Sequence, residues 1–475
     1  MRGGKSFLIL FVLAAAIGSY AYFVESKREV SSDATGTPAA KPTKVWTIES
    51  DKIEEIDVRS TNGETTKLKK TGPTWQIVAP EQADADQDAV STILTAIAGL
   101  ESVRTVDENP PDAKPFELEP ARVSVTVRVA GDTTPKGIEI GGKTPTGSDL
   151  YARVQGQPKV FLVATFLEEQ LNRTLFDLRD KTVLKFDRGA VDSLAIQAQG
   201  SASLTAARTG SEQWRLSAPV AAKADFSVLD GVIGQLSQAR MKSIVAADGS
   251  KDAAKYGLDR PQATVMLGAG STRATLVIGG KSPDGALYAR DMTRPAVFTV
   301  ETTLLDGVKK TPDDVRQKML FEFRSYSALS IDITHGPESF SFAKQIAPPP
   351  ADQSAAPAPD TWKQTKPAAK DLELTKITDF LVDVANLKAE SFTTRAAASG
   401  DDYVITVRFG EQSAPTEERA TFRKSGTTVH ALVQGEPGAA VVPTADFDKM
   451  VAGLKGLTTT APAPPAPPAP ATPKK

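Results

Sequence analysis

Residues 137–144 read GIEIGGKT, which matches the phosphate-loop pattern G-x-x-x-x-G-K-[ST]. The matching positions are Gly137, Gly142, Lys143 and Thr144. In such a loop, backbone N–H groups and the lysine bind phosphates, and a helix begins at the Gly-Lys-Thr end. Here Pro145 and Gly147 follow directly and lead into residues 150–153 (LYAR), which is typical of a strand–turn–strand connection. We therefore interpret the match as chance and predict no nucleotide site and no cofactor. The glycine pair is expected to supply backbone angles that residues with a Cβ avoid.

Three aspartates form a second chemical pattern. Asp84, Asp86 and Asp88 alternate in the segment DADQDA and resemble the first half of a calcium-binding loop. Such a loop needs a glycine at its sixth position and a glutamate at its twelfth, where this chain has Ala89 and Thr95. An aspartate just before a helix caps the free N–H groups of the first turn. We predict that these aspartates mark the start of a helix near Asp88 and hold no metal.

The overall composition limits the chemistry further. The chain of 475 residues carries 56 Lys and Arg against 58 Asp and Glu, so its net charge of −2 offers no basic surface for a nucleic acid. It has no cysteine, and its two histidines, His335 and His430, lie far apart in the sequence. No catalytic residue and no metal site are predicted, and both histidines are assigned structural or surface roles.

The N-terminus has the pattern of a membrane anchor. Residues 1–6 carry two basic side chains, and residues 7–24 follow without a formal charge. A helix of this length spans about 27 Å, close to the thickness of the hydrocarbon core of a bilayer. The basic residues predict a single-pass anchor with its N-terminus in the cytoplasm and the remaining chain outside. A cleaved signal peptide is the alternative, but bulky aromatic residues at the end of the apolar run make a poor cleavage site.

Beyond the anchor the sequence repeats itself at a long period. IGGKTPTGSDLYAR at 140–153 returns as IGGKSPDGALYAR at 278–290, and Trp75 returns as Trp214. The second copy has Thr275 where the phosphate-loop pattern has its first glycine, so the pattern is not shared. Both copies are long enough to bury an apolar core of their own.

A third copy is more divergent. It carries Trp362, lacks the Gly-Gly-Lys turn, and has His430 where the other copies have Tyr151 and Tyr288. The predicted organisation is a basic N-terminus (1–6), an anchor (7–24), a flexible linker (25–44), three repeats (45–185, 186–322 and 323–457), a Pro/Ala-rich insertion in the third repeat (346–360) and a disordered Pro/Ala-rich tail (458–475).

Hydrophobic periodicity predicts the elements inside each repeat. Valines alternate with polar residues over 123–129, which predicts a half-buried strand. Apolar residues over 90–97 recur at the i, i+3, i+4, i+7 spacing of one helix face, and the other two repeats have the same spacing after their tryptophans. We predict an α+β fold in which each repeat is a mainly antiparallel sheet with one main helix and a short closing helix.

Repeated polar residues are the remaining candidates for function. The candidate interaction surface consists of Tyr151, Arg153, Tyr288, Arg290, Arg179, Lys181, Arg316 and Lys318. Each Tyr–Arg pair is predicted on one face of a strand, and each Arg–Lys pair in the segment that closes its repeat. The functional interpretation is a recognition surface used twice. In the structural interpretation, which we favour, each Tyr–Arg pair holds adjacent strands together and each Arg–Lys pair is a charged cap on a helix end.

These motifs resemble the bacterial family called Domain of Unknown Function 4340. The resemblance is carried by the anchor, the tryptophan strand, the [FY]-x-L-[DE]-x-P turn (FELEP and YGLDRP), IGG-K-x-P, LYAR and VF-x-V. It covers the first two repeats well and the third in part. The family has no established activity and no accepted catalytic residues. The resemblance implies a bacterial inner-membrane location, a periplasmic chain, and a role beside ABC-type transport systems of the gliding-motility-auxiliary kind.

Two functions from different classes follow. The first is a non-enzymatic, membrane-anchored periplasmic repeat protein that contacts an ABC-type transporter or another envelope protein. The alternative is an envelope ligand-binding protein that holds a glycan or lipid in clefts between repeats.

Overall fold

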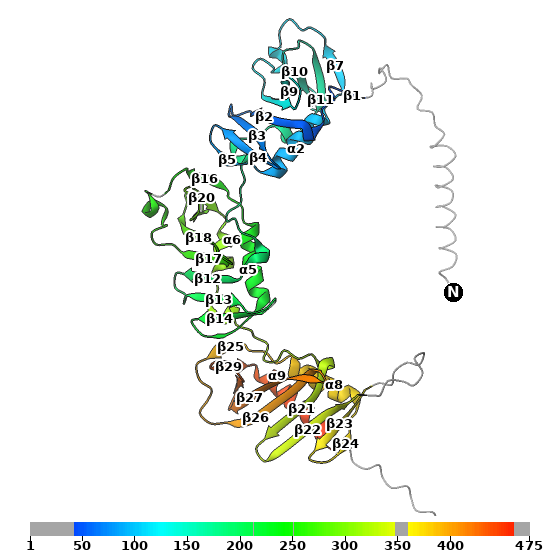
Figure 1. Cartoon of the computed structure of the whole chain (residues 1–475), viewed down its shortest axis with the longest axis vertical. Helices are drawn as coiled ribbons and strands as arrows, with labels where there is room; N and C mark the ends of the chain where they lie inside the picture. The colour runs from blue at the N-terminus through cyan, green and yellow to red at the C-terminus, as the bar shows by residue number, and fades with distance from the viewer. Residues whose placement is uncertain (1–41, 212, 250, 347–359, 460–475) are drawn as a thin grey trace, which may run out of the picture. The chain divides into compact units, whose positions relative to one another are not determined.

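The computed structural model describes residues 42–211, 213–249, 251–346 and 360–459. The predicted anchor (7–24) lies outside this part of the chain, as do most of the predicted linker, insertion and tail. Among the described residues, no helix is long and apolar enough to cross a bilayer. The chain divides into two compact units, with Asp180 the last residue of the first and Lys181 the first residue of the second. The first contains one sheet and the second contains two (Figure 1).

Each repeat forms one nine-stranded antiparallel sheet with the same strand order. In the first sheet the order is β5 (Ala83–Asp84), β4 (Thr74–Ala79), β3 (Thr65–Thr71), β2 (Ile53–Arg59), β8 (Val123–Val129), β9 (Lys136–Lys143), β10 (Asp149–Val154), β11 (Val160–Ala164) and β7 (Arg104–Asp107). Short strands β1 (Thr43–Lys44) and β6 (Glu101–Ser102) pair beside it. Strand β1 occupies the last two residues of the segment predicted as a linker.

The second and third sheets repeat this topology strand for strand. The second is β15 (Ala222–Ala224), β14 (Trp214–Ala218), β13 (Leu204–Arg208), β12 (Ser193–Ala198), β17 (Ala263–Ala269), β18 (Thr272–Lys281), β19 (Leu287–Asp291), β20 (Val297–Val300) and β16 (Ser243–Ala246). The third is β24 (Lys370–Asp371), β23 (Thr361–Lys366), β22 (Glu338–Gln345), β21 (Ala328–His335), β26 (Asp401–Glu411), β27 (Ala414–Ser425), β28 (Thr428–Val433), β29 (Ala439–Val442) and β25 (Ser391–Thr393). The predicted α+β repeats with mainly antiparallel sheets are confirmed.

One main helix follows the tryptophan hairpin in each repeat. These helices are α2 (Gln87–Ala98), α5 (Phe226–Gln238) and α8 (Leu374–Ala385). In α2 the side chains of Val90, Ile93 and Ile97 are fully buried, as the helical spacing predicts. Burial alternates along the central strands, so the helices cover one face of each sheet and leave the other facing solvent.

The closing helices differ between repeats. Repeats one and two end in two short helices each, α3 (Phe166–Leu171) with α4 (Leu175–Leu178) and α6 (Thr302–Val308) with α7 (Pro312–Val315). The third ends in one long helix, α9 (Thr444–Thr458), rather than the predicted short one. Phe447, Met450 and Leu454 of α9 are buried in the third core, where they pack with residues of α8. The longer helix thus supplies apolar area to the most divergent repeat.

The aspartate pattern is a helix cap. The Asp86 side chain accepts hydrogen bonds from the N–H groups of Asp88 and Ala89 at the start of α2. Asp225 caps α5 in the same way. Replacing Asp86 with alanine is expected to lower the free energy of unfolding by about 1 kcal/mol, because two N–H groups lose their acceptor. Urea unfolding measures the loss. The variant D88A, which removes only a carboxylate near the helix dipole, should lose less than half as much.

Candidate functional site

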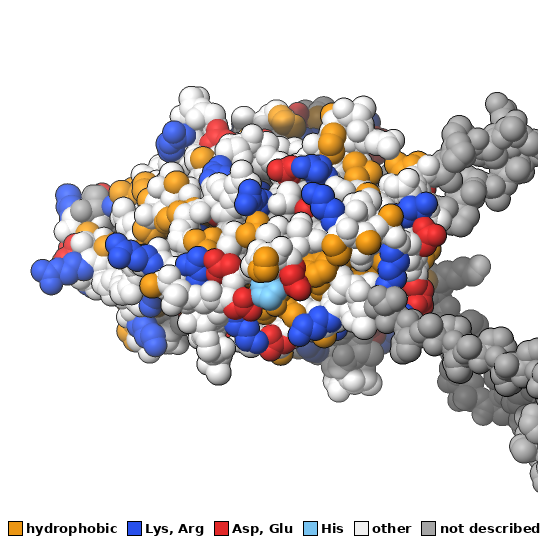
Figure 2. Space-filling model, turned by 90° about the horizontal axis from the view of Figure 1, so that it is seen from below, with side chains coloured by type: hydrophobic (Ala, Val, Ile, Leu, Met, Phe, Trp, Pro, Cys, Tyr) orange, Lys and Arg blue, Asp and Glu red, His pale blue; other side chains and the backbone are white. Residues whose placement is uncertain are grey.

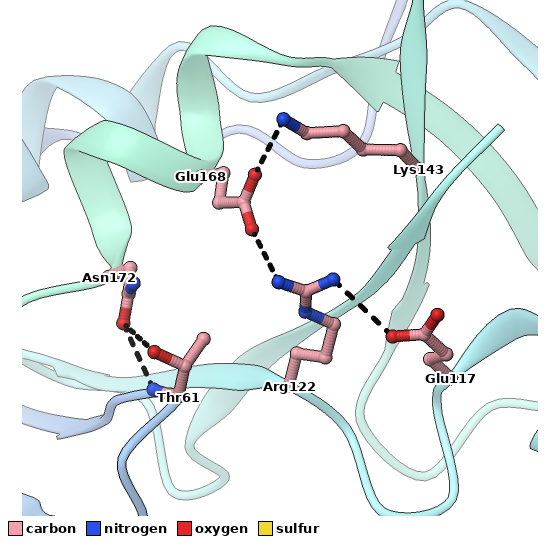
Figure 3. Close-up of polar contacts among 6 residues, drawn as sticks. All are labelled: Thr61, Glu117, Arg122, Lys143, Glu168 and Asn172. Carbon is pink, nitrogen blue, oxygen red and sulfur yellow. Dashed lines mark hydrogen bonds and ion pairs between the residues drawn. The ribbon is translucent and has the colours of Figure 1, made fainter. Parts of the chain in front are cut away.

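The Gly-Gly-Lys segment is the end of a strand. β9 runs through Lys143, and the turn that follows leads into β10. The Lys143 ammonium lies 3.5 Å from a carboxylate oxygen of Glu168 on α3 (Figure 3). The Thr144 N–H donates to the Asp149 carbonyl across the turn. No helix begins at Lys143, so the geometry that aims N–H groups at a phosphate is absent from this segment.

The glycine pair allows a close approach of two backbone segments. A Cβ on Gly141 would lie 2.0 Å from the Phe116 carbonyl oxygen, and a Cβ on Gly279 would lie 2.3 Å from the Tyr256 carbonyl oxygen. Those carbonyls belong to the FELEP and YGLDRP turns, which therefore pack directly on the strand end. Neither glycine has a positive φ, and the expectation of unusual backbone angles for the pair is wrong. Gly147, in the turn, is the glycine with a positive φ.

The third repeat shows what replaces the pair. In the first sheet Ile140 pairs with Ala152, and in the third sheet Phe422 pairs with Ala431 at the equivalent position. The next residue along each strand is therefore Gly141 in the first repeat and Arg423 in the third. The first two sheets have a register shift at the glycines, whereas β27 and β28 pair without interruption. The Arg423 guanidinium forms two hydrogen bonds of 2.7 Å with Asp402. The same guanidinium donates to the Ala397 carbonyl at 2.9 Å, so Arg423 ties the strand end to a neighbouring strand and to the segment before β26.

The tyrosines of the repeated Tyr–Arg pairs also contact that turn. The Tyr151 ring lies 4.9 Å from the Phe116 ring, and the Tyr288 ring lies 5.0 Å from the Tyr256 ring. Arg153 binds Glu139 and Glu119 and donates to the Leu118 carbonyl, whereas Arg290 donates to the Arg294 carbonyl at 3.3 Å. All four residues thus have packing or bonding partners within their own repeat.

A further polar network joins α3 to the first sheet. Arg122 binds Glu168 at 3.1 Å and Glu117 at 3.4 Å, so Glu168 bridges Arg122 and Lys143 (Figure 3). Thr61 donates to the Asn172 side-chain oxygen through both its N–H and its hydroxyl. The sequence analysis did not single out Arg122 or Glu168. Exposed ion pairs such as these contribute about 0–1 kcal/mol each, and this network anchors the helix rather than creating a pocket.

The Arg–Lys segments connect elements through their backbones. The Lys181 carbonyl accepts from the Met241 N–H, and the Lys318 carbonyl accepts from the Ala389 N–H, both at 2.7 Å. Leu320 and Phe321 are buried in the core of the third sheet, before the predicted start of the third repeat at residue 323. The segment from Lys318 to Phe321 therefore belongs to the third repeat, although it was predicted to close the second repeat.

The two arginines of these segments have different surroundings. Arg179 forms an ion pair of 2.6 Å with Glu81. Arg316 is only 7% exposed, and among the described residues no carboxylate lies within ion-pair distance of it. Its guanidinium donates to the Pro437 carbonyl at 3.0 Å and lies 3.7 Å above the Phe392 ring. Burial lowers the pKa of Arg316, although the charges of Asp313 and Glu436 oppose that shift.

Arg316 lines a cavity of about 230 Å³ in the second compact unit. Its wall is formed by segment 316–322 together with β27, β28 and the turn before β29. Leu320, Val433 and Ala440 give it an apolar part. A buried cation beside an apolar surface is typical of a ligand site, because pockets combine apolar walls with a few fixed polar groups.

Carboxylates also line this cavity. The Glu418 carboxylate accepts from the Glu322 N–H at 2.9 Å, and the Glu436 carboxylate accepts from the Lys223 N–H at 2.9 Å. The Lys223 ammonium pairs with Glu322 at 2.6 Å. Burial raises the pKa of Glu418 above its ordinary value, and the charge of Glu322 adds to that shift. The sequence analysis missed Glu418 and Glu436. Glu436 replaces Gln157 in the aligned segments VQGEP and VQGQP, and this change of charge is the signal that could have found it.

The Glu418 shift predicts a pH-dependent effect. Since the folded-state pKa is raised, Glu418 favours folding below its unfolded pKa, and this contribution is lost as the pH rises through the folded pKa. We expect E418Q to melt at a higher temperature than the wild type at neutral pH and at the same temperature below about pH 4. Thermal unfolding across this range measures the difference. The neighbouring exposed Glu417, which pairs with Arg408, offers the control E417Q, whose melting temperature should not rise at neutral pH.

The two histidines differ in their surroundings: His335 has side-chain partners, whereas the buried Nδ1 of His430 has no hydrogen-bond partner among the described residues. The His335 ring stacks on the Tyr403 ring at 4.0 Å, and its Nε2 lies 2.7 Å from the Asp401 carboxylate. His430 lies in β28 opposite Val441. In the described part of the chain, no group of three or more His, Asp or Glu side chains is arranged to hold a metal ion. Basic and acidic side chains intermix over the face that Figure 2 draws.

Comparison with known proteins identifies the family. No curated protein and no solved structure matches the chain. One family matches twice, over residues 75–213 and 214–404, and each match begins at a tryptophan of a hairpin strand. The two matches together span more than half of the chain and all of the glycine pairs and Tyr–Arg pairs. The chain therefore belongs to the family described as a domain of unknown function, DUF4340.

Proposed function

We propose that the protein is a non-enzymatic binding scaffold of the bacterial envelope. In this proposal, residues 7–24 anchor it in the inner membrane with the N-terminus in the cytoplasm, and the three repeats are periplasmic. It acts as an accessory or interaction subunit of an ABC-type transport system of the gliding-motility-auxiliary kind, or of another envelope assembly. The anchor pattern and the family membership support this location and partner class.

The observation that carries the proposal is that the residues shared by the repeats are occupied in packing. Gly141 and Gly279 admit a turn onto a strand end, and Tyr151 and Tyr288 contact that turn. Side chains used in this way maintain a shape that is present in several copies, as expected of a scaffold.

Capture from native membranes tests the partner. The full chain, tagged at its C-terminus and cross-linked in cells, should retain transporter subunits after detergent extraction. A chain whose residues 1–24 are replaced by a cleavable secretion signal is the control and should retain much less, because it no longer concentrates at the membrane. Recovery of the anchored chain without any transporter subunit would contradict this partner.

A second candidate function is the binding of a small envelope ligand. The cavity beside Arg316 supports it, because a buried guanidinium without a carboxylate partner is costly unless a ligand or solvent satisfies it. Thermal-shift measurements on the detergent-purified full chain with envelope glycans and lipids test this function, with R316Q as the variant expected to lose any shift.

A further inference from the structure

The cavity in the second compact unit has two poles of opposite charge. One pole is Arg316, whose guanidinium stacks on Phe392 and donates to a single carbonyl. The other is Glu418, a partly buried carboxylate that accepts from the Glu322 backbone. Although both line the same cavity, Arg316 and Glu418 form no ion pair with each other. The lining therefore offers a cation and an anion at separate positions.

Most of the other charges around the cavity have partners. Lys223 pairs with Glu322 at 2.6 Å, and Glu417 pairs with Arg408 at 2.9 Å. Glu436 lies 3.5 Å from Arg215 and accepts from the Lys223 N–H. Arg419 also lines the cavity and is exposed to solvent. Four carboxylates against three cations make the lining unfavourable for a ligand that carries only negative charge, such as inorganic phosphate.

We propose that this cavity binds a small zwitterion, an amino acid or a dipeptide, with its carboxylate on Arg316 and its ammonium on Glu418. The inference rests on the second candidate function and adds the chemical class of the ligand. A guanidinium binds a carboxylate through parallel N–H donors, and a partly desolvated carboxylate binds an ammonium more strongly than it would in water. The apolar side chains of Leu320, Val433 and Ala440, which line the same cavity, suit a short aliphatic side chain of the ligand.

The cavity volume agrees with a ligand of this size. About 230 Å³ is several times the volume of one water and below that of pockets for drug-sized molecules. Such a ligand would also account for a carboxylate at a position where its charge disfavours folding. A bound ammonium would lower the free energy of the ionised form that burial disfavours.

Isothermal titration of the full chain, purified in detergent, tests the inference. The probes are glycine, L-alanyl-L-alanine and D-alanyl-D-alanine, with N-acetyl and methyl-ester derivatives that each remove one charge. We expect at least one zwitterion to bind, and blocking either end to weaken its binding about tenfold or more. R316Q and E418Q should each weaken binding by a similar factor. R179Q, at the matching position of the first repeat, should bind as the wild type does.

The outcomes separate the inference from the function on which it rests. Binding that is unaffected by R316Q, or by blocking both ends of the probe, would overturn the zwitterion site. If only a glycan or lipid binds, in a manner sensitive to R316Q, the ligand class is wrong and the cavity remains a binding site. If no probe binds, both the zwitterion site and the second candidate function are wrong. Circular dichroism of R316Q and R316K shows whether a variant that loses binding is still folded. R316K should keep part of the affinity, because lysine keeps the positive charge.

Discussion

Replacing Trp214 with alanine is expected to lower the free energy of unfolding by about 3–5 kcal/mol. Trp214 begins β14 and is 2% exposed, and the Arg208 guanidinium lies 5.3 Å from its ring. The truncation leaves a cavity in the second core and removes this cation–π contact. Denaturant unfolding of the full chain, followed by circular dichroism, measures the change.

The variant W214F is the matched control. The indole N–H of Trp214 is buried and has no hydrogen-bond partner among the described residues. Phenylalanine removes that unsatisfied donor and fills most of the volume, so W214F should lose less than half as much stability as W214A. A loss of under 1 kcal/mol for W214A would show that the tryptophan is not part of the core that organises the second repeat.

Replacing Gly279 with alanine is expected to destabilise the same unit by about 3 kcal/mol, the upper part of the range for overpacking. The added methyl group would lie 2.3 Å from the Tyr256 carbonyl oxygen, and a backbone atom cannot move away as a side chain can. Either the YGLDRP turn lifts from β18 or the strand end shifts. Chemical denaturation at equilibrium measures the loss.

The adjacent glycine gives a control that differs by one position. A Cβ on Gly280 would lie 3.5 Å from the same oxygen, which is an ordinary contact. G280A should therefore stay within about 0.5 kcal/mol of the wild type. Equal effects of G279A and G280A would contradict the packing role assigned to the glycine pair.

Local periodicity and repetition were sufficient to predict three α+β repeats with mainly antiparallel sheets, but not the strand order or the closing helices. The helical spacing over residues 90–97 and the alternation over 123–129 each report which face of an element is buried, and the structure has α2 and β8 at these places. The two well-preserved copies also indicated that Lys143 ends a strand, since the second copy keeps the turn residues but not the first glycine of the phosphate loop.

The role of the glycine pair could not be read in the same way. Gly279 is required by the Tyr256 carbonyl, which comes from a turn more than twenty positions earlier in the chain. A single sequence shows that a glycine is present, but not whether it serves a positive φ or a close approach. The FELEP and YGLDRP turns had been noted as separate motifs, and only the fold shows that they pack on the glycines.

The cavity beside Arg316 was not predicted from the sequence. Arg316 was a candidate because it repeats Arg179, yet the two arginines differ in that Arg179 is paired with Glu81. Glu418 and Glu436 lie in the divergent third repeat and belong to no shared motif. Sequence reasoning that looked for similarity between repeats passed over the positions where the repeats differ in charge.

The central claim is that the residues shared by the repeats maintain shape, with ligand chemistry confined to a single-copy cavity. Thermal unfolding of the wild type and of the double variant K143Q/K281Q, each with and without Mg-ATP, tests it most directly. The account predicts no stabilisation by Mg-ATP in either protein and a stability of the variant within about 1 kcal/mol of the wild type, because Lys143 makes only an exposed ion pair. A melting temperature that rises with Mg-ATP in the wild type and not in the variant would contradict it.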